Sequence, residues 1–142
     1  MQNISYPATL SSEKKRSVTL AGLPEAITSG VNLQDALVQA ADCLQEAIAG
    51  RIVRKEDIPL PVKPRRGQHG IEVALYLAPK LALYLAMRTR GMSNSELARR
   101  LKTSETVVRR MLDPHHDTKP EKLQTALEAL GKRILIAVDD AA

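Results

Sequence analysis

The chain has 142 residues, 44% of them hydrophobic, and a formal net charge of +5 at pH 7. This length suits one ordinary domain or two small ones, and the core must consist of Leu, Ile, Val and Ala, because Phe and Trp are absent. No run of about 18 apolar residues is present, which excludes a membrane span. The N-terminus has no secretory pattern and Cys43 has no second cysteine to pair with, so we expect a cytoplasmic protein.

The first part of the chain has the alternation of apolar and polar side chains that marks half-buried strands. We predict strands over residues 4–10 and 18–21, joined by a polar turn at Ser11 to Lys15. Gly22-Leu23-Pro24 interrupts the alternation, and a short strand is expected at Ala26 to Thr28.

A helix follows, with Asn32 as its N-cap, Asp35 in its first turn and Gly50 as its C-terminal stop. Its predicted apolar stripe is Leu33, Leu37, Ala40, Ala41, Leu44 and Ile48. Asp42 and Glu46 lie one turn apart on the polar face. Since no third ligand or histidine lies nearby, we interpret them as a solvated face rather than a metal or acid–base pair.

The connection over residues 51–70 contains IPLPVKP, whose prolines favour an extended path, and the basic stretch RRGQHG. That stretch is either a surface loop or a contact segment for an acidic partner. The next stretch, IEVALYL at residues 71–77, predicts a strand that returns to the N-terminal sheet. Its inward positions would be Ile71, Val73, Leu75 and Leu77. Residues 1–78 are therefore predicted to form a small α+β domain.

Residues 79–142 are predicted to form a second, all-α domain, which begins with a helix from Pro79 to Gly91. The stretch from Ser93 to Leu112 then predicts two short helices joined by a tight turn, the helix-turn-helix arrangement that reads DNA. An ordinary helical hairpin with a solvated face is the alternative.

The ends of these two helices are marked by capping residues. Ser93 and Glu96 form a capping box, and Thr103 or Ser104 can cap the second helix. Lys102 stands where such turns often carry glycine, because the backbone there is left-handed; lysine adopts that conformation at modest cost.

The second helix has an apolar side and a polar side. Its predicted buried residues are Val107, Val108, Met111 and Leu112. Short polar side chains and two arginines occupy the other side, and such residues at the start of a reading helix meet base edges and phosphates. The predicted DNA-binding residues are Ser104, Glu105, Thr106, Arg109, Arg110, Lys102, Ser93 and Arg99. Between Lys80 and Arg110 the sequence has eight basic residues and only Glu96 and Glu105 as acids, which favours phosphate contacts.

The loop after these helices carries His115 and His116, which we interpret as loop residues rather than metal ligands. Thr118 and Glu121 form a second predicted capping box, with Pro120 in the first turn of the helix. The apolar stripe of that helix is Leu123, Ala126, Leu127 and Leu130, and Gly131 follows as the stop.

The C-terminal segment from Lys132 to Val138 is predicted to be a strand that is apolar on both faces. Such a strand needs a partner, and the same strand of a second subunit would supply it. The predicted dimer interface is Ile134, Ile136 and Val138.

The order of these features resembles the HicB antitoxin family of bacterial toxin–antitoxin systems. The stretches that carry the resemblance are YPATL, LPEAITSGVNLQDALVQAADCL, IPLP, IEVALYL, NSELARRLKTSETVVRRML and HHDTKPEKLQTALEALGKRI. The resemblance implies that residues 1–78 form a domain like a degraded RNase H fold, which blocks a small ribonuclease toxin, HicA. It also implies that residues 79–142 form a Cro/repressor-like helix-turn-helix that represses the operon.

Two alternatives remain open. A stand-alone transcriptional repressor would use its N-terminal domain to sense a small ligand. A nuclease, which the RNase H resemblance raises, needs several carboxylates converging on metal ions, and the predicted strands offer only Glu72. We therefore expect no enzyme activity, no metal and no cofactor. The expected partners are a HicA-like toxin, double-stranded operator DNA and further copies of this chain as a homodimer or higher oligomer.

Overall fold

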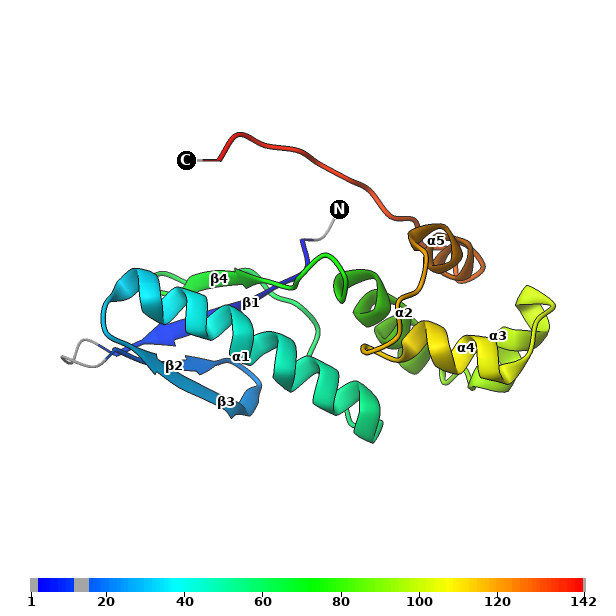
Figure 1. The fold of residues 1–142 in the computed structure, drawn as a ribbon, viewed down its shortest axis with the longest axis horizontal. Helices are drawn as coiled ribbons and strands as arrows, with labels where there is room; N and C mark the ends of the chain where they lie inside the picture. The colour runs from blue at the N-terminus through cyan, green and yellow to red at the C-terminus, as the bar shows by residue number, and fades with distance from the viewer. Residues whose placement is uncertain (1–2, 12–15, 142) are drawn as a thin grey trace. The chain divides into compact units, whose positions relative to one another are not determined.

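The computed structural model describes residues 3–11 and 16–141, so most of the turn predicted at Ser11 to Lys15 lies outside the described residues. The chain divides into two compact units, Met1–Ala78 (unit 1) and Pro79–Ala142 (unit 2). Figure 1 shows strands and one long helix in unit 1, and shorter helices followed by an extended tail in unit 2. The predicted α+β class is confirmed by a four-stranded antiparallel sheet and by the helices of the described residues.

The sheet of unit 1 is antiparallel throughout, in the order β3-β2-β1-β4. Its strands are β1 (Ser5–Leu10), β2 (Arg16–Leu20), β3 (Leu23–Gly30) and β4 (His69–Glu72). The first two agree with the predicted hairpin. The third is longer than the predicted residues 26–28, because β3 is an edge strand and therefore tolerates Pro24, which cannot donate a hydrogen bond.

Helix α1 (Leu33–Arg54) covers one face of this sheet (Figure 1). Asn32 caps it as predicted, since its Oδ1 accepts from the Asp35 backbone N–H at 2.8 Å. The prediction that Gly50 stops the helix is wrong. The helix runs on to Arg54 because Ile52 extends the buried stripe by one turn, and Lys55 ends it with a left-handed backbone, φ 58°. The buried residues are Ala36, Ala40, Leu44, Ala47, Ile48 and Ile52.

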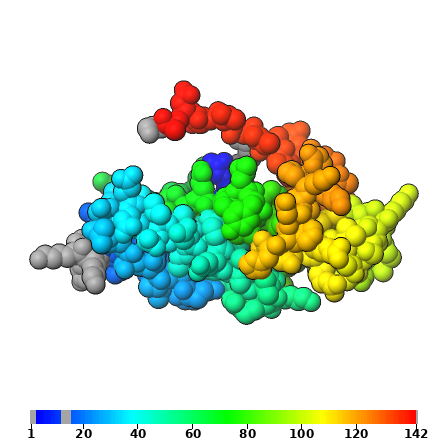
Figure 2. Space-filling model, viewed as in Figure 1, coloured from blue at the N-terminus to red at the C-terminus, as the bar shows by residue number. Residues whose placement is uncertain are grey.

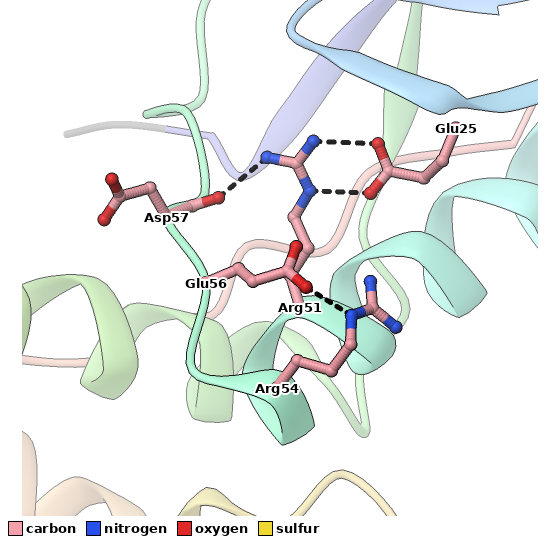
Figure 3. A network of polar contacts seen from close by, with 5 residues as sticks. All are labelled: Glu25, Arg51, Arg54, Glu56 and Asp57. Carbon is pink, nitrogen blue, oxygen red and sulfur yellow. Dashed lines mark hydrogen bonds and ion pairs between the residues drawn. The ribbon is translucent and has the colours of Figure 1, made fainter.

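The end of α1 is tied to the sheet and to the connection by charged side chains (Figure 3). The Arg51 guanidinium donates to both carboxylate oxygens of Glu25 on β3, at 2.7 and 2.8 Å, and to the Asp57 carbonyl at 2.7 Å. Arg54 pairs with Glu56 beside it. The hydrogen bond from Arg51 is the main reason that the pKa of Glu25 falls to about 2.

A second tie joins the proline-rich connection to the sheet. Tyr6 on β1 is buried, and its hydroxyl donates to the Pro59 carbonyl at 2.7 Å. Burial raises the pKa of this phenol, so it stays a hydrogen-bond donor at any ordinary pH. The extended path predicted for IPLPVKP is therefore anchored along its first half.

The strand predicted over residues 71–77 is wrong beyond Glu72. The backbone N–H of Ala74 donates to Gln45 Oε1 of α1 at 2.9 Å, and Gln45 Nε2 donates to the Glu72 carbonyl at 3.2 Å. The chain then turns, because the N–H groups of Leu77 and Ala78 both donate to the Ala74 carbonyl. A helix side chain thus takes the backbone groups that a longer strand would have used.

Unit 2 packs its helices around an aliphatic and methionine core. The helices are α2 (Ala78–Arg90), α3 (Asn94–Leu101), α4 (Glu105–Leu112) and α5 (Pro120–Glu128). The largest core residues are Leu83, Met87, Met92, Leu97, Val108, Met111, Leu123, Leu127 and Leu130. Flexible methionines fill the irregular gaps that a chain without Phe or Trp leaves open. The predicted stripe of α5 is confirmed.

The capping box predicted for α5 is wrong. The helix begins at Pro120 as expected, but its N-cap is Lys119, which makes no side-chain capping bond. The hydroxyl of Thr118 instead donates to the Arg110 carbonyl at 3.3 Å and accepts from Lys80 Nζ at 2.9 Å. The Thr118 hydroxyl is therefore occupied by its bonds to Arg110 and Lys80, and it does not cap α5.

The C-terminal strand predicted over Lys132 to Val138 is also absent, since the described residues after Gly131 form no helix or strand. Ile134 is half-buried against the core of its own unit, whereas Ile136 and Val138 are 87% and 94% exposed. A strand needs a neighbouring strand to complete its hydrogen-bond ladder, and the described residues of unit 2 contain no other strand. Figure 2 shows the tail as a single file of residues leaving the helices of its unit.

Candidate nucleic-acid interface

Two short helices joined by a three-residue turn, α3 and α4, lie where the sequence predicts them. Ser93 Oγ accepts from the Glu96 N–H at 3.2 Å, and Ser104 Oγ accepts from the Val107 N–H at 3.4 Å. Each bond satisfies one of the backbone N–H groups that the start of its helix leaves open. Both serines are therefore engaged as caps, which fixes where each helix begins.

The turn depends on Lys102, which has φ 54° and ψ 45° and so lies in the left-handed region. Its N–H donates to the Arg99 carbonyl at 3.2 Å, and the next N–H, of Thr103, donates to the Ala98 carbonyl at 2.9 Å. These bonds end α3 in the way a glycine usually does. The prediction that lysine adopts this conformation is confirmed.

The outer side of α4 carries a small polar network. Arg109 and Arg110 are exposed, and Arg109 Nη1 lies 3.7 Å from Glu105 Oε2 one turn earlier. The other oxygen of Glu105 accepts from Asn94 Nδ2 of α3 at 3.4 Å. Glu105 therefore links the two helices and holds one arginine, and Thr106 beside it is half-buried.

Four of the eight predicted DNA-binding residues keep exposed basic side chains: Arg99, Lys102, Arg109 and Arg110. An exposed guanidinium can bind guanine edges or phosphates bidentately, and an exposed ammonium can bind phosphate. The other four have mainly structural roles. Ser93 and Ser104 cap the two helices, Glu105 contacts Asn94, and Thr106 is partly buried.

Sequence analysis missed the part played by Lys80. This residue of α2 is 2% exposed, and its Nζ donates to the carbonyls of Met111 (3.0 Å) and Arg110 (3.3 Å) at the C-terminal end of α4. Helix ends leave such carbonyls without partners and favour a positive charge beside them. The count of basic residues from Lys80 to Arg110 assumed that Lys80 contributes to a basic surface. Because its ammonium is buried, it cannot do so. Its position on the same helical stripe as Leu83, Tyr84 and Met87 was the available signal.

The loop after α4 closes around the same ammonium. Lys80 Nζ donates to Thr118 Oγ1, which lies 3.1 Å from His116 Nδ1, while the His115 N–H donates to Asp113 Oδ1 at 2.9 Å. Burial lowers the pKa of Lys80, and the nearby carboxylates of Asp113 and Asp117 oppose that effect. Lys80 thus joins α2, the end of α4 and this loop.

The part of the chain that the structure describes contains neither a metal-binding cluster nor a membrane-spanning helix. No three His, Cys, Asp or Glu side chains gather there in a group that could hold a metal ion. None of the described helices has the length and hydropathy of a membrane-spanning segment.

Comparison with known proteins identifies the family. Residues 5–82 match the family model described as HicB_like antitoxin of bacterial toxin-antitoxin system. Antitoxin HicB of Escherichia coli (strain K12) is 34% identical over 135 residues, which cover 94% of this chain and 98% of that protein. Antitoxin HicB 2 of Photorhabdus laumondii is 32% identical over 139 residues, or 96% and 99% of the two chains.

A third relative is Antitoxin HicB of Pseudomonas fluorescens (strain Pf0-1), which is 30% identical over 125 residues, or 87% of this chain and 86% of that protein. These similarities span both units, and the family model covers more than half of the chain. The chain therefore belongs to the HicB-like antitoxin family of bacterial toxin–antitoxin systems.

Proposed function

We propose that this antitoxin neutralises a HicA-like ribonuclease toxin with unit 1 and represses its own operon by binding operator DNA with unit 2. Membership of the antitoxin family supports the first activity, because the family model matches residues 5–82. The observation that carries the second is the exposed pair Arg109 and Arg110 on a short helix that is fixed at both ends. The further resemblance of unit 1 to an RNase H fold stays a prediction.

Operator binding is supported by how firmly α4 is held. Ser104 caps its start, Lys80 binds its last carbonyls, and Glu105 links it to α3. A helix that reads base edges must present its side chains with little freedom, since loose positioning loses affinity. Arg99 and Lys102 would add phosphate contacts beside it.

The proposed assembly is a homodimer formed through the tail. Ile136 and Val138 are highly exposed, and pairing with the same segment of a second copy would lower the free energy by removing this apolar surface from water. Two-fold symmetry would place two copies of α4 on successive half-sites of an operator. Ile134, already half-buried in its own unit, would mark where the paired segment begins.

The Arg109→Ala variant tests the DNA-binding half of this proposal. We expect it to weaken binding to the promoter DNA of its own operon by about 1–3 kcal/mol, because a bidentate base contact is lost. The measurement is a fluorescence-anisotropy titration of the full chain at fixed salt. Arg66→Ala, an exposed arginine of unit 1, is the matched control and should bind like the wild type. If Arg109→Ala also binds with the affinity of the wild type, α4 is refuted as the reading helix.

The toxin-binding half is tested by mixing the full chain with a HicA-like toxin protein. A stoichiometric complex on gel filtration, and relief of the growth arrest that this protein causes alone, are the expected results. Operator binding without any such complex would instead favour a stand-alone repressor with a ligand-sensing unit 1.

A further inference from the structure

An open groove lies in unit 1 between α1 and the segment that follows β4. It is lined by Ala41, Asp42, Gln45, Glu46, Glu72, Val73, Ala74, Leu75 and Tyr76. Leu75 is 89% exposed and Tyr76 is 61% exposed, although the sequence pattern assigned Leu75 to the sheet interior. Two large apolar side chains exposed side by side in the sequence are costly to leave in water and are typical of a contact surface.

The backbone that carries these two side chains is held firmly. Gln45 of α1 binds both the Glu72 carbonyl and the Ala74 N–H, and the Ala74 carbonyl accepts from the N–H groups of Leu77 and Ala78. Leu77 is fully buried and anchors the far end of the turn. The turn that presents Leu75 and Tyr76 is thus ordered before any partner arrives, which lowers the entropy cost of binding.

The charge of the groove specifies its partner. Its lining includes the carboxylates of Asp42, Glu46 and Glu72 and contains no lysine or arginine. A ribonuclease must bind the RNA phosphate backbone and therefore carries a basic surface. The acidic rim complements such a surface and repels nucleic acid itself.

From the exposed anchors, the ordered turn and the acidic rim, we propose that this groove is the docking site for the basic toxin, with Leu75 and Tyr76 as apolar anchors and the three carboxylates as a steering rim. The inference rests on the proposed function, since it locates the surface used for toxin neutralisation. Tyrosine is among the residues that most often dominate binding energy at such interfaces.

The test measures, by surface plasmon resonance, how variants of the full chain bind a purified HicA-like toxin. The double variant Leu75→Ala/Tyr76→Ala is expected to bind at least about 30-fold more weakly, mainly through faster dissociation. The matched control, Val53→Ala/Val62→Ala, changes two exposed apolar residues elsewhere in unit 1 and should bind like the wild type. Glu46→Lys should instead slow association, and this effect should shrink at high salt. Unchanged thermal unfolding shows that each variant is folded.

The outcomes separate this inference from the proposed function. If the wild type binds the toxin and the Leu75/Tyr76 variant binds it equally well, the groove is refuted while toxin neutralisation stands. If the wild type does not bind, both fail. If the double variant instead loses self-association in sedimentation velocity, with toxin binding intact, the groove is an interface between copies of this chain and the proposal is overturned.

Discussion

At the scale of single residues, the chain is organised by charged side chains that bind backbone carbonyls. Arg51 binds the Asp57 carbonyl in unit 1, and Lys80 binds the carbonyls of Arg110 and Met111 in unit 2. Each gives a partner to carbonyls that helix ends or irregular backbone leave open. Such roles are hard to predict from sequence, because Lys and Arg are usually solvated. The residues beside them in the sequence do not indicate which distant carbonyl they will bind.

The Lys80→Met variant tests the importance of this buried ammonium. Methionine has a similar length but donates no hydrogen bond, so the α4 carbonyls lose a buried partner. We expect the free energy of unfolding of unit 2 to fall by about 1–3 kcal/mol, and operator affinity to fall with it. Urea unfolding followed by circular dichroism measures the first effect. Lys122→Met, at an exposed position of α5, is the control and should change neither quantity. Wild-type stability in Lys80→Met would show that the cap is dispensable.

The Glu25–Arg51 pair predicts a dependence of stability on pH. The pKa of Glu25 is about 2 in the folded chain, below the usual value of about 4.3 for glutamate in an unfolded chain. Its contribution is therefore complete above about pH 5 and is lost as the pH falls from about 4 towards 2. Because the Glu25 side chain is 38% exposed and solvent screens the pair, we expect it to contribute only about 1 kcal/mol to the free energy of unfolding.

The measurement for this pair is urea unfolding between pH 5 and pH 2 for the wild type and for Glu25→Gln. The difference in unfolding free energy between the two proteins should narrow as the pH falls. Glu128→Gln, which removes a carboxylate from α5 outside the Figure 3 network, serves as control. A difference that stays constant across this range would contradict the assigned role of the pair.

At the scale of elements, sequence patterns located the starts of helices better than the C-terminal ends of helices and strands. The N-caps Asn32 and Ser93 were predicted from local chemistry, and Ser104 was one of two residues predicted as alternative caps of α4, because a short polar side chain bonds an N–H only a few residues away. The predicted ends at Gly50 and Leu77 were wrong in opposite directions. One helix ran past its glycine to bury Ile52, and one strand ended early because Gln45, distant in sequence, took its backbone groups.

The candidate site was predictable to a similar extent. The sequence located α3, the turn and α4, since each is set by neighbours within a few residues. It did not reveal that Glu105 would join Asn94 and Arg109, or that Thr118 would bind Lys80 instead of capping α5. Those contacts depend on packing between helices, which no local pattern specifies.

Lys102→Gly separates stability from DNA binding at the turn. Glycine removes the strain of a left-handed lysine, which stabilises the folded state by about 1–2 kcal/mol. It also makes the unfolded chain more flexible, which offsets about 0.4–1 kcal/mol of that gain. We expect a net stabilisation of up to about 1 kcal/mol with weaker operator binding. If Lys102 contacts phosphate, the slope of the logarithm of the binding constant against the logarithm of salt concentration should also become shallower by about 0.9.

The matched control for the turn is Lys102→Ala, which removes the charge and keeps the strain. It should lose the same operator affinity without the gain in stability, as measured by thermal unfolding and by titration at several salt concentrations. Operator binding by the glycine variant with the wild-type affinity and slope would place Lys102 outside the DNA interface.

At the scale of the whole molecule, the two units have separate cores and separate proposed partners. The boundary follows Ala78, and in the described tail of unit 2 the apolar residues Ile136 and Val138 are highly exposed. The proposed homodimer would pair this tail with the same tail of a second copy, because two identical edges can satisfy each other's hydrogen bonds. In that proposal, assembly would use residues that the fold of one chain leaves exposed.

Truncation of the chain after Lys132 tests this assembly. We expect a weaker dimer, because the exposed apolar residues Ile136 and Val138 are removed. Sedimentation velocity over a range of concentrations measures the dimer dissociation constant. The full-length variant Ile136→Ser/Val138→Ser should weaken the dimer in the same direction, which excludes an effect of chain length alone. A truncated protein that sediments as the intact one does would refute the tail interface.

The uneven distribution of sulfur gives the molecule an uneven response to oxidants. The buried core of unit 2 contains Met87, Met92 and Met111, whereas the described core of unit 1 contains no methionine. The thiol of Cys43 in unit 1 is protected chemically, because burial raises its pKa and keeps the reactive thiolate scarce. Sulfoxide formation would place polar oxygen inside unit 2 and loosen its packing. Oxidation of these methionines would therefore impair the unit proposed to silence the operon, whereas the described core of the unit proposed to restrain the toxin offers no methionine to oxidise.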